Sequence, residues 1–239
     1  MKLTLIRANA LPILDQLHLE EALTREGDGL YCLINWGAPP AIVLGISGKI
    51  EEVNLDEAER LQIPLIRRFS GGGTVVIDEE TLLTSLIGPK EALGFPCFPE
   101  PLMRWSADLY GEALRLPGFS LRHNDYTLGE RKCAGNAQYL TKSRFIHHTS
   151  FLFDLNPKHM HCLHMPSRTP PYRAGRSHLD FLSTLKDHFP SKESIASQLR
   201  STLAKRYTLV ELPFNEVAAL VKPTRLSSHL VDLRGLRGP

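Results

Sequence analysis

The sequence lacks the features that would place it in several large protein classes. It has only four cysteines in 239 residues, Cys32, Cys97, Cys133 and Cys162, and no two of them form a Cys-x-x-Cys pair. Reduced thiols in a cytoplasmic protein are therefore expected, rather than a zinc ribbon or a disulfide framework. No apolar run reaches the ~18–20 residues that a membrane-spanning helix needs. The chain is expected to be soluble and cytoplasmic, without a membrane partner.

An excess of charge of one sign is also missing. The formal net charge is +2, from 28 Lys and Arg against 26 Asp and Glu, and the basic residues are dispersed along the chain. A nucleic-acid-binding domain usually gathers Lys and Arg on one face, so no nucleic-acid partner is expected. Asp15, Glu20 and Glu21 come too early for a signal or transit peptide.

What the sequence does contain is a succession of short periodic segments without an internal repeat. Strands are expected over residues 2–6, 30–36, 41–45, 65–68, 74–78, 81–87, 125–129, 131–140 and 148–155. Helices are expected over residues 11–26, 54–61, 100–114, 177–188, 191–207 and 215–222. Strands that mostly follow one another argue against a doubly wound parallel sheet. The predicted fold class is α+β, with a mixed, mainly antiparallel sheet flanked by helices.

Local signals add detail to these elements. Asn54, followed three residues later by Glu57, predicts a capping box, and Ser191 predicts a helix cap. In helix 11–26 the apolar residues recur at helical spacing and the acids lie on the other face. We expect a single domain over residues 1–239, ending in a basic tail over residues 224–239.

The stretch RRFSGGGTVVID, residues 67–78, is the first candidate site. Three glycines can adopt positive φ, and their N–H groups can point into one anion-binding concavity. A strand rather than a helix follows, so this is not a known phosphate-loop motif, and a ligand would lie across a sheet. Arg67 and Arg68 alternate along the preceding strand, so one guanidinium should face the site and bind carboxylate or phosphate. A tight hairpin with surface arginines is the alternative.

The stretch HNDYTLGERKCAGNAQ, residues 123–138, is the second candidate site. It contains Asn124, Asp125 and Lys132, followed by the small residues Gly135 and Ala137. A lysine beside small residues can approach a ligand closely and supply a positive charge. Alone, an exposed strand lysine would be the simpler interpretation. The combination with the glycine run favours a functional lysine.

These two stretches, followed by HHTSFLF at residues 147–153, together resemble the lipoate–protein ligase A family of the biotin/lipoate ligase superfamily. The similarity runs over residues 14–185. It implies the catalytic-domain fold of that superfamily, which is similar to class II aminoacyl-tRNA synthetases. It also implies that lipoate or octanoate reacts with ATP, in the presence of Mg²⁺, to give acyl-AMP and pyrophosphate. The acyl group would then pass to a lysine of a lipoyl domain, in a 2-oxoacid dehydrogenase E2 subunit or glycine-cleavage H protein.

The resemblance also implies roles for individual residues. Lys132 would be catalytic and contact the carbonyl and the α-phosphate, while Asp125 would orient Lys132 or hold Mg²⁺. Arg68 would contact the nucleotide phosphate or the acyl carboxylate, and a side chain at Gly72 would stand in the ligand's approach path. The residues expected to bind the substrates are Arg68, Ser70, Gly71, Gly72, Gly73, Thr74, Val75, Val76, Asn124, Asp125, Gly135, Ala137 and His148.

The chain departs from the family pattern at three positions. Glu80 stands for a glycine, Leu83 for an asparagine, and Thr149 where glycine is common. These departures concern the geometry around ATP and the metal. Relatives with bacterial ligase activity often carry a further C-terminal domain. Either a separate accessory-domain subunit supplies that domain, as a candidate partner, or the domain is dispensable.

Three alternatives remain at this point. Octanoyltransferases share the fold and transfer an acyl group through a cysteine thioester without ATP. The expected cysteine is absent from residues 116–125, strand alternation turns Cys133 away from the ligand, and Cys162 is the other late candidate. HMHCLH, residues 159–164, has the ligand types of a zinc site on a strand, but no second cluster completes it. The third alternative is a non-catalytic homologue that binds lipoyl domains.

Overall fold

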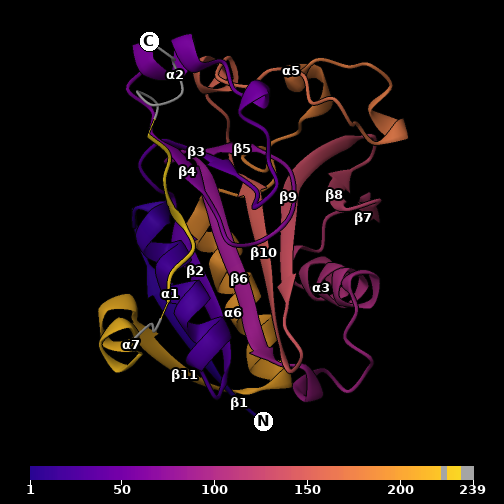
Figure 1. Ribbon diagram of the computed structural model, residues 1–239. Coiled ribbons are helices and arrows are strands. Elements are labelled where there is room, and N and C mark those ends of the chain that lie inside the picture. The colour runs from indigo at the N-terminus through magenta and orange to yellow at the C-terminus, as the bar shows by residue number, and fades with distance from the viewer. Residues whose placement is uncertain (222–224, 233–239) are drawn as a thin grey trace.

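A computed structural model describes residues 1–221 and 225–232, and a large mixed sheet organises them (Figure 1). The strand order is β11 (Thr208–Pro213), β1 (Lys2–Ala8), β2 (Leu30–Trp36), β6 (Thr81–Pro89), β10 (Arg144–Leu152), β9 (Arg131–Leu140), β8 (Asp125–Leu128) and β7 (Phe119–Arg122). β1 pairs in parallel with β11 and β2, whereas the pairs from β2 onward are antiparallel. The predicted mixed, mainly antiparallel α+β fold is confirmed.

A smaller sheet carries the glycine run. Its strand order is β12 (His229–Leu230), β4 (Leu65–Arg67), β3 (Ala41–Leu44) and β5 (Val75–Ile77). Because β3 lies between β4 and β5, the residues that join β4 to β5 cross over β3 and form no hairpin. We call residues 68–74 the glycine loop.

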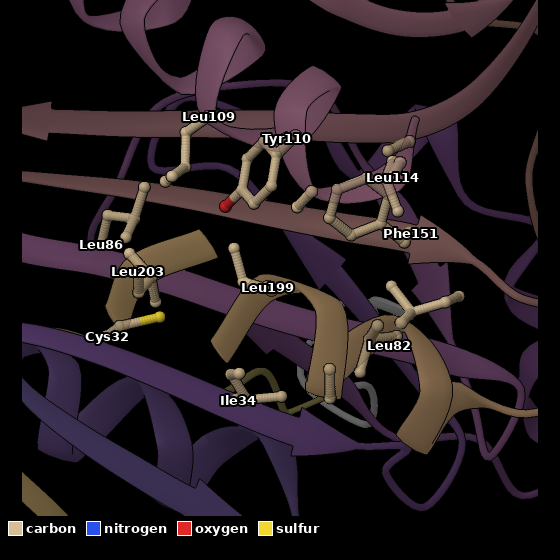
Figure 2. Close-up of a cluster of buried hydrophobic side chains, with 14 of the residues drawn as sticks. Cys32, Ile34, Leu82, Leu86, Leu109, Tyr110, Leu114, Phe151, Leu199 and Leu203 are labelled. Atoms are coloured by element: carbon tan, nitrogen blue, oxygen red, sulfur yellow. The ribbon is translucent and has the colours of Figure 1, made fainter. Parts of the chain in front are cut away.

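Helices cover both faces of the large sheet. α3 (Pro99–Leu114) and α6 (Lys192–Arg206) cover one face, while α1 (Ile13–Glu26) and the small sheet cover the other (Figure 1). Figure 2 shows Leu109 of α3 and Leu203 of α6 directed toward Leu86 of β6. Complete burial of one such leucine stabilises the fold by roughly 1.5–3 kcal/mol. This core fixes the position of the strands that carry the site.

Short helices complete the described chain. They are α2 (Leu55–Arg60), α4 (Pro157–Met160), α5 (His178–Phe181), α7 (Phe214–Leu220) and the 3₁₀ turns Ile50–Glu52, Lys90–Leu93 and Pro171–Arg173. Both predicted N-caps are confirmed, since Asn54 accepts a hydrogen bond from the Glu57 N–H and Ser191 from the Ser194 N–H. The capping box is wrong in its second half, because the Glu57 carboxylate binds Arg60 and the Asn54 N–H donates to the Cys162 carbonyl. Of the helices in residues 1–221 and 225–232, none has the length and apolarity to cross a membrane.

The helix expected over residues 177–188 is wrong beyond its first turn. α5 ends at Phe181, and the Ser183 N–H then donates to the Lys132 carbonyl at 2.8 Å. The Leu185 N–H likewise donates to the Leu152 carbonyl at 2.9 Å. Tertiary hydrogen bonds to β9 and β10 therefore replace the helical ones. The sequence pattern also missed β7 and β11, and it began β10 four residues late.

The acids of α1 are not all on a solvent-facing side. The side chains of Glu20 and Glu21 are fully buried. Glu21 accepts hydrogen bonds from the Ser227 and Ser228 N–H groups, at 2.9 and 3.2 Å to Oε2. We call residues 225–230, which lie along α1 and β4, the C-terminal strap. The expected tail therefore has an ordered part, and residues 222–224 and 233–239 lie outside the described residues.

A buried histidine gives the fold a pH-dependent element. His147 on β10 is completely buried, and its Nδ1 and Nε2 lie 3.0 Å from Gln138 Nε2 and Tyr126 Oη. The glutamine amide donates to Nδ1, so the ring proton lies on Nε2. The Nε2–H group donates to Tyr126 Oη. Burial, and secondarily the charge of His148, lowers the pKa of His147 to about 3.

We expect this histidine to reduce stability in acid. The unfolded chain binds a proton near the ordinary histidine pKa of about 6.5, whereas the folded chain binds it only near pH 3. The free energy of unfolding should therefore fall by about 2 kcal/mol from His147 alone between about pH 7.5 and about pH 5. Urea unfolding at both pH values would measure this for wild type, His147→Gln, and His229→Gln on exposed β12 as the control. An equal pH dependence in all three proteins would contradict the assignment.

Candidate active site

A cavity of about 790 Å³ lies between the two sheets. Its walls come from the start of α1, the glycine loop, β5, β6, β9 and β10, and residues 164–178 pass over it. We call residues 164–178 the covering segment. Five basic side chains line the cavity, namely Lys49, Arg68, Lys132, Arg168 and Arg173. They outnumber the lining acids, Glu52 and Asp125, so the cavity suits an anionic small molecule.

Arg68 holds the glycine loop in shape from behind. Its side chain is buried, and it donates hydrogen bonds to the carbonyls of Val43 (3.2 Å), Gly71 (2.8 Å) and Gly73 (2.9 Å). Burial lowers the pKa of Arg68 to about 10, so the guanidinium stays charged at neutral pH. Arg67 instead binds the Gly45 and Gly48 carbonyls outside the cavity. Arg68 is thus the arginine that lines the cavity, but its guanidinium is bound to main-chain carbonyls, and neither arginine is a free surface residue. Contact of Arg68 with a carboxylate or phosphate stays a prediction.

The glycines of the loop have different roles. Gly72 has φ +102°, and a Cβ there would lie 2.7 Å from Arg68 Nη2 and 3.2 Å from Ala137 Cβ. A Cβ on Gly73 would meet nothing within 4 Å, although Gly73 lines the cavity. The first atoms that a side chain at Gly72 would meet therefore belong to Arg68 and β9, at the contact between the loop and β9. Gly73 is the glycine that leaves the approach open.

A change of register on β9 directs Lys132 into the cavity. Tyr126 on β8 lies opposite Ala134, but the next residue, Thr127, lies opposite Lys132, so Cys133 is an extra residue. Cys133 and Ala134 both pack in the core beneath α3. Strict alternation would place Lys132 on the face of Ala134. The bulge places it on the opposite face, where it lines the cavity.

Lys132 is held by an ion pair at the cavity wall. Its Nζ lies 2.7 Å from Asp125 Oδ1, and Tyr172 of the covering segment donates its hydroxyl proton to Asp125 Oδ2 at 2.8 Å. A Cβ on Gly135 would lie 3.4 Å from Nζ, in ordinary van der Waals contact, so Gly135 lies directly beside the ammonium group. The Lys132 side chain keeps 23% of its surface exposed, which leaves it able to contact a ligand.

His148 closes another part of the cavity wall. Its Nδ1 lies 3.0 Å from Oε2 of Glu20, and Glu20 Oε1 accepts hydrogen bonds from Gln16 (2.7 Å) and Ser85. His148 Nε2 is buried and has no hydrogen-bond partner among the described residues. Glu20 was not predicted as a site residue, although its place directly after Leu19 on an amphipathic helix was the available signal.

The structure brings nearly all of the predicted site residues together. The predicted residues that line the cavity are Arg68, Gly72, Gly73, Thr74, Val75, Val76, Asn124, Asp125, Lys132, Gly135, Ala137 and His148. Ser70 and Gly71 do not line it: Ser70 is fully buried, and the Gly71 N–H donates to the Gln138 carbonyl at 3.2 Å. The contribution of the covering segment was missed, because a proline-rich loop has no periodicity from which to infer its position.

The residues present do not form a metal site by themselves. Within residues 1–221 and 225–232, no group of three or more His, Cys, Asp or Glu side chains could hold a metal ion. Both carboxylate oxygens of Asp125 already have partners, and one partner is a cation. HMHCLH lies on α4 and a turn rather than on a strand, and His159 binds Asp78 at 2.8 Å. The strand that the zinc alternative would need is therefore not formed, and no metal-binding group was found among the described residues.

All four cysteines lie within the described residues, and none of them lines the cavity. Each is buried and free. Burial raises the pKa of Cys32 and Cys133 to about 12, and it also raises the pKa of Cys97 and Cys162. A thiolate nucleophile at the cavity is therefore not supported.

Known proteins share this sequence pattern. The family model described as lipoyl protein ligase A/B catalytic domain matches residues 12–204. The chain is 29% identical over 197 residues to a protein of Plasmodium falciparum named inactive lipoate–protein ligase 2, covering 67% of this chain and 51% of that protein. It spans about a third to a half of the length of the first curated relatives that it matches.

Solved structures share the architecture. A crystal structure of lipoate-protein ligase A bound with ATP aligns with a TM-score of 0.73 at 20% identity, covering 92% of this chain and 91% of that chain. A structure from work on the bipartite lipoate protein ligase of Thermoplasma acidophilum and its E2 lipoyl domain also has a TM-score of 0.73 at 20% identity. It covers 91% of this chain and 88% of that chain. At this identity the likeness shows that the fold is shared.

Proposed function

Because the chain belongs to the lipoyl protein ligase A/B catalytic-domain family, we propose that it is a lipoate–protein ligase. The proposed reaction has two steps. A carboxylate oxygen of lipoate or octanoate attacks the α-phosphorus of ATP, and pyrophosphate leaves. A lysine amine of a lipoyl domain then attacks the acyl carbonyl, the C–O bond to AMP breaks, and an amide forms.

One observation carries this proposal: the Lys132 ammonium lies at the wall of an anion-suited cavity beside a stretch of bare main chain. The first step brings a carboxylate and a triphosphate together, so negative charge concentrates in the transition state. A positive group that is already in place stabilises that charge without reorganisation. In the second step the same ammonium group would polarise the carbonyl and stabilise its oxyanion.

The cavity also has suitable places for both ends of an acyl-adenylate. Ile13, Leu17 and Leu83 provide apolar surface where an acyl tail would be removed from water. Arg168 and Arg173 of the covering segment provide positive charge for phosphate. The N–H groups from Gly73 to Val76 are proposed to line the anhydride, with Arg68 acting through the loop that it holds.

Magnesium does not fit as an ion held by Asp125 in this arrangement. Both oxygens of that carboxylate are bound, and the Lys132 charge would repel a cation. Mg²⁺ commonly keeps water ligands and binds through substrate phosphates rather than in an all-protein cage. We therefore assign no protein ligand to Mg²⁺.

A specific observation supports a second candidate function, a non-catalytic homologue. The Plasmodium falciparum relative is named an inactive ligase. Leu83 lines the cavity and offers no hydrogen bond there. The pattern of the lipoate–protein ligase A family has an asparagine at this position. A cysteine-dependent transferase has no comparable support, because the four thiols are buried away from the cavity.

Lipoyl domains are the proposed partners, in E2 subunits or the H protein. The Thermoplasma acidophilum structure comes from work on a ligase and its E2 lipoyl domain, which makes such a domain the first acceptor to try. That ligase is described as bipartite, so an accessory subunit is a second proposed partner.

The proposed function is tested by incubating the purified chain with apo lipoyl domain, lipoate and Mg-ATP. We expect pyrophosphate release and an acyl mass increase on the lipoyl domain, both dependent on ATP. Transfer from an acyl-carrier protein without ATP would instead indicate a transferase. If neither pyrophosphate release nor acyl transfer occurred, with ATP or with supplied lipoyl-AMP, and this persisted after an accessory-domain protein was added, the chain would be the non-catalytic homologue.

A further inference from the structure

The covering segment is connected to Lys132 from two sides. Just beyond its end, the Ser183 N–H donates to the Lys132 carbonyl at 2.8 Å, and Leu182 forms a bridge with Lys132. From within the segment, Tyr172 reaches the lysine's ion-pair partner, Asp125. The same segment contributes Arg168 and Thr169 to the cavity wall. The covering segment therefore contacts the cavity and the ion pair of the lysine, and the residues that follow it, up to Ser183, contact the backbone of the lysine.

The Tyr172 ring docks the segment on the β7–β8 turn. It stacks on the His123 ring with centroids 5.9 Å apart and an interplanar angle of 8°. The Arg122 guanidinium carbon lies 5.4 Å from the Tyr172 ring centroid, and the Phe181 ring centroid lies 5.1 Å away. These contacts use the ring and leave the hydroxyl for a separate role.

The hydroxyl determines how Asp125 faces Lys132. It donates to Oδ2 at 2.8 Å while Oδ1 accepts from Lys132 Nζ at 2.7 Å, so each carboxylate oxygen has one partner. The Asp125 side chain keeps only 14% of its surface exposed, so water replaces a lost partner poorly. Burial and the neighbouring carboxylate raise the pKa of Tyr172, so its hydroxyl remains a proton donor at neutral pH. Without that hydroxyl the carboxylate is held by Lys132 alone.

We propose that Tyr172 is a positioning residue: its hydroxyl orients Asp125, and Asp125 in turn directs the Lys132 ammonium group into the cavity while the covering segment is docked. The proposal rests on the proposed function for its catalytic consequence. It assigns to the segment a role in placing the lysine as well as in covering the ligand. Small misplacements of a reacting group slow a reaction strongly, so loss of one hydroxyl should be measurable.

The main test is Tyr172→Phe, which keeps the ring contacts and removes only the hydroxyl. We expect kcat for lipoate-dependent pyrophosphate release to fall roughly 10- to 100-fold. The KM values for ATP and lipoate should change less than about threefold, because substrate contacts are retained. Loss of one hydrogen bond to a poorly exposed carboxylate should lower the melting temperature by about 2–8 °C, so the rates are measured well below that temperature. Wild-type kcat in this variant, or a rise in KM alone, would overturn the proposal.

A matched control and a double variant separate positioning from general structure. Tyr31→Phe removes a tyrosine hydroxyl that also binds an aspartate, Asp28 at 3.2 Å, and Tyr31 does not line the cavity. It should leave kcat unchanged. In an Asp125→Ala background the hydroxyl has no carboxylate to orient, so adding Tyr172→Phe should cause no further loss of kcat. Losses that multiply independently would show that Tyr172 does not act through Asp125.

A chemical readout keeps this inference separate from the proposed function. Reductive methylation of the free protein with formaldehyde and cyanoborohydride, read at Lys132 by peptide mass spectrometry, needs no ligase activity. Tyr172→Phe should be labelled several-fold faster at Lys132 than wild type, because the ion pair is less well fixed, whereas Tyr31→Phe should not. Equal rates would overturn the positioning role. If the wild-type chain released no pyrophosphate in the test of the proposed function, that function would be overturned. The comparison of labelling rates at Lys132 would still test the positioning role of Tyr172.

Discussion

Lys132→Ala is expected to lower the rate of lipoate-dependent pyrophosphate release by at least ~10²- to 10³-fold, which is typical of removing one preorganised donor. The reason is that the bulge at Cys133 directs this ammonium into a cavity where carboxylate and phosphate would meet. The variant should still fold, because the Lys132 side chain is partly exposed. Asp125 retains Tyr172 as a partner, so we expect a loss of stability of about 1–3 kcal/mol.

The matched control for this prediction is Lys186→Ala. Lys186 also forms an ion pair, with Asp154 at 2.8 Å, but it does not line the cavity. At saturating ATP and lipoate, Lys186→Ala should therefore release pyrophosphate at the wild-type rate, which is at least ~10²- to 10³-fold faster than the rate of Lys132→Ala. If Lys132→Ala kept wild-type activity while remaining folded, the central role of the lysine would be refuted.

Gly72→Val is expected to abolish binding of an acyl-adenylate by deforming the loop rather than by blocking the ligand directly. Its φ of +102° is unfavourable for a branched side chain, and the added Cβ would lie 2.7 Å from Arg68 Nη2. Displacing Arg68 would break its hydrogen bonds to the Gly71 and Gly73 carbonyls. Strain and lost bonds together should destabilise the fold by about 2–4 kcal/mol. Calorimetric titration with a non-hydrolysable acyl-adenylate analogue measures the loss of binding.

Gly94→Val is the control for strain without contact. Gly94 has φ +72° and open space around its Cβ position, and it does not line the cavity. It should lose about 1–3 kcal/mol of stability but bind the analogue as wild type does. Binding by Gly72→Val that matched the Gly94→Val control would show that the Arg68-held shape of the loop is not needed.

The parts of this protein that could be predicted from sequence are those with local causes. Glycine conformational freedom located the loop, and strand periodicity with few intervening helices indicated a mixed sheet. Asn54 and Ser191 were identified as caps because a cap depends on residues two or three positions away. Lys132 stood out through the small residues beside it, although its direction into the cavity comes from a bulge that no pattern in the sequence marked.

The parts that could not be predicted depend on partners distant in the sequence. Glu20 looked like a solvent-facing helix acid, but its partners Ser85 and His148 lie on β6 and β10. The helix expected after residue 181 gave way to hydrogen bonds with Lys132 and Leu152. The direction of the Gly72 Cβ could not be inferred either, because it depends on where Arg68 and β9 lie in space.

The C-terminal strap has a consequence for when the site can form during synthesis. Ser228 Oγ accepts from the Phe69 N–H at 3.1 Å, just before the glycines, and the Ser228 N–H binds Glu21 of α1. A ribosome must therefore extend the chain by 159 residues beyond Phe69 before this contact can form. Until then β4 also lacks its partner β12, and the glycine loop lacks this support. Its binding site is thus among the last parts of the described chain to be completed.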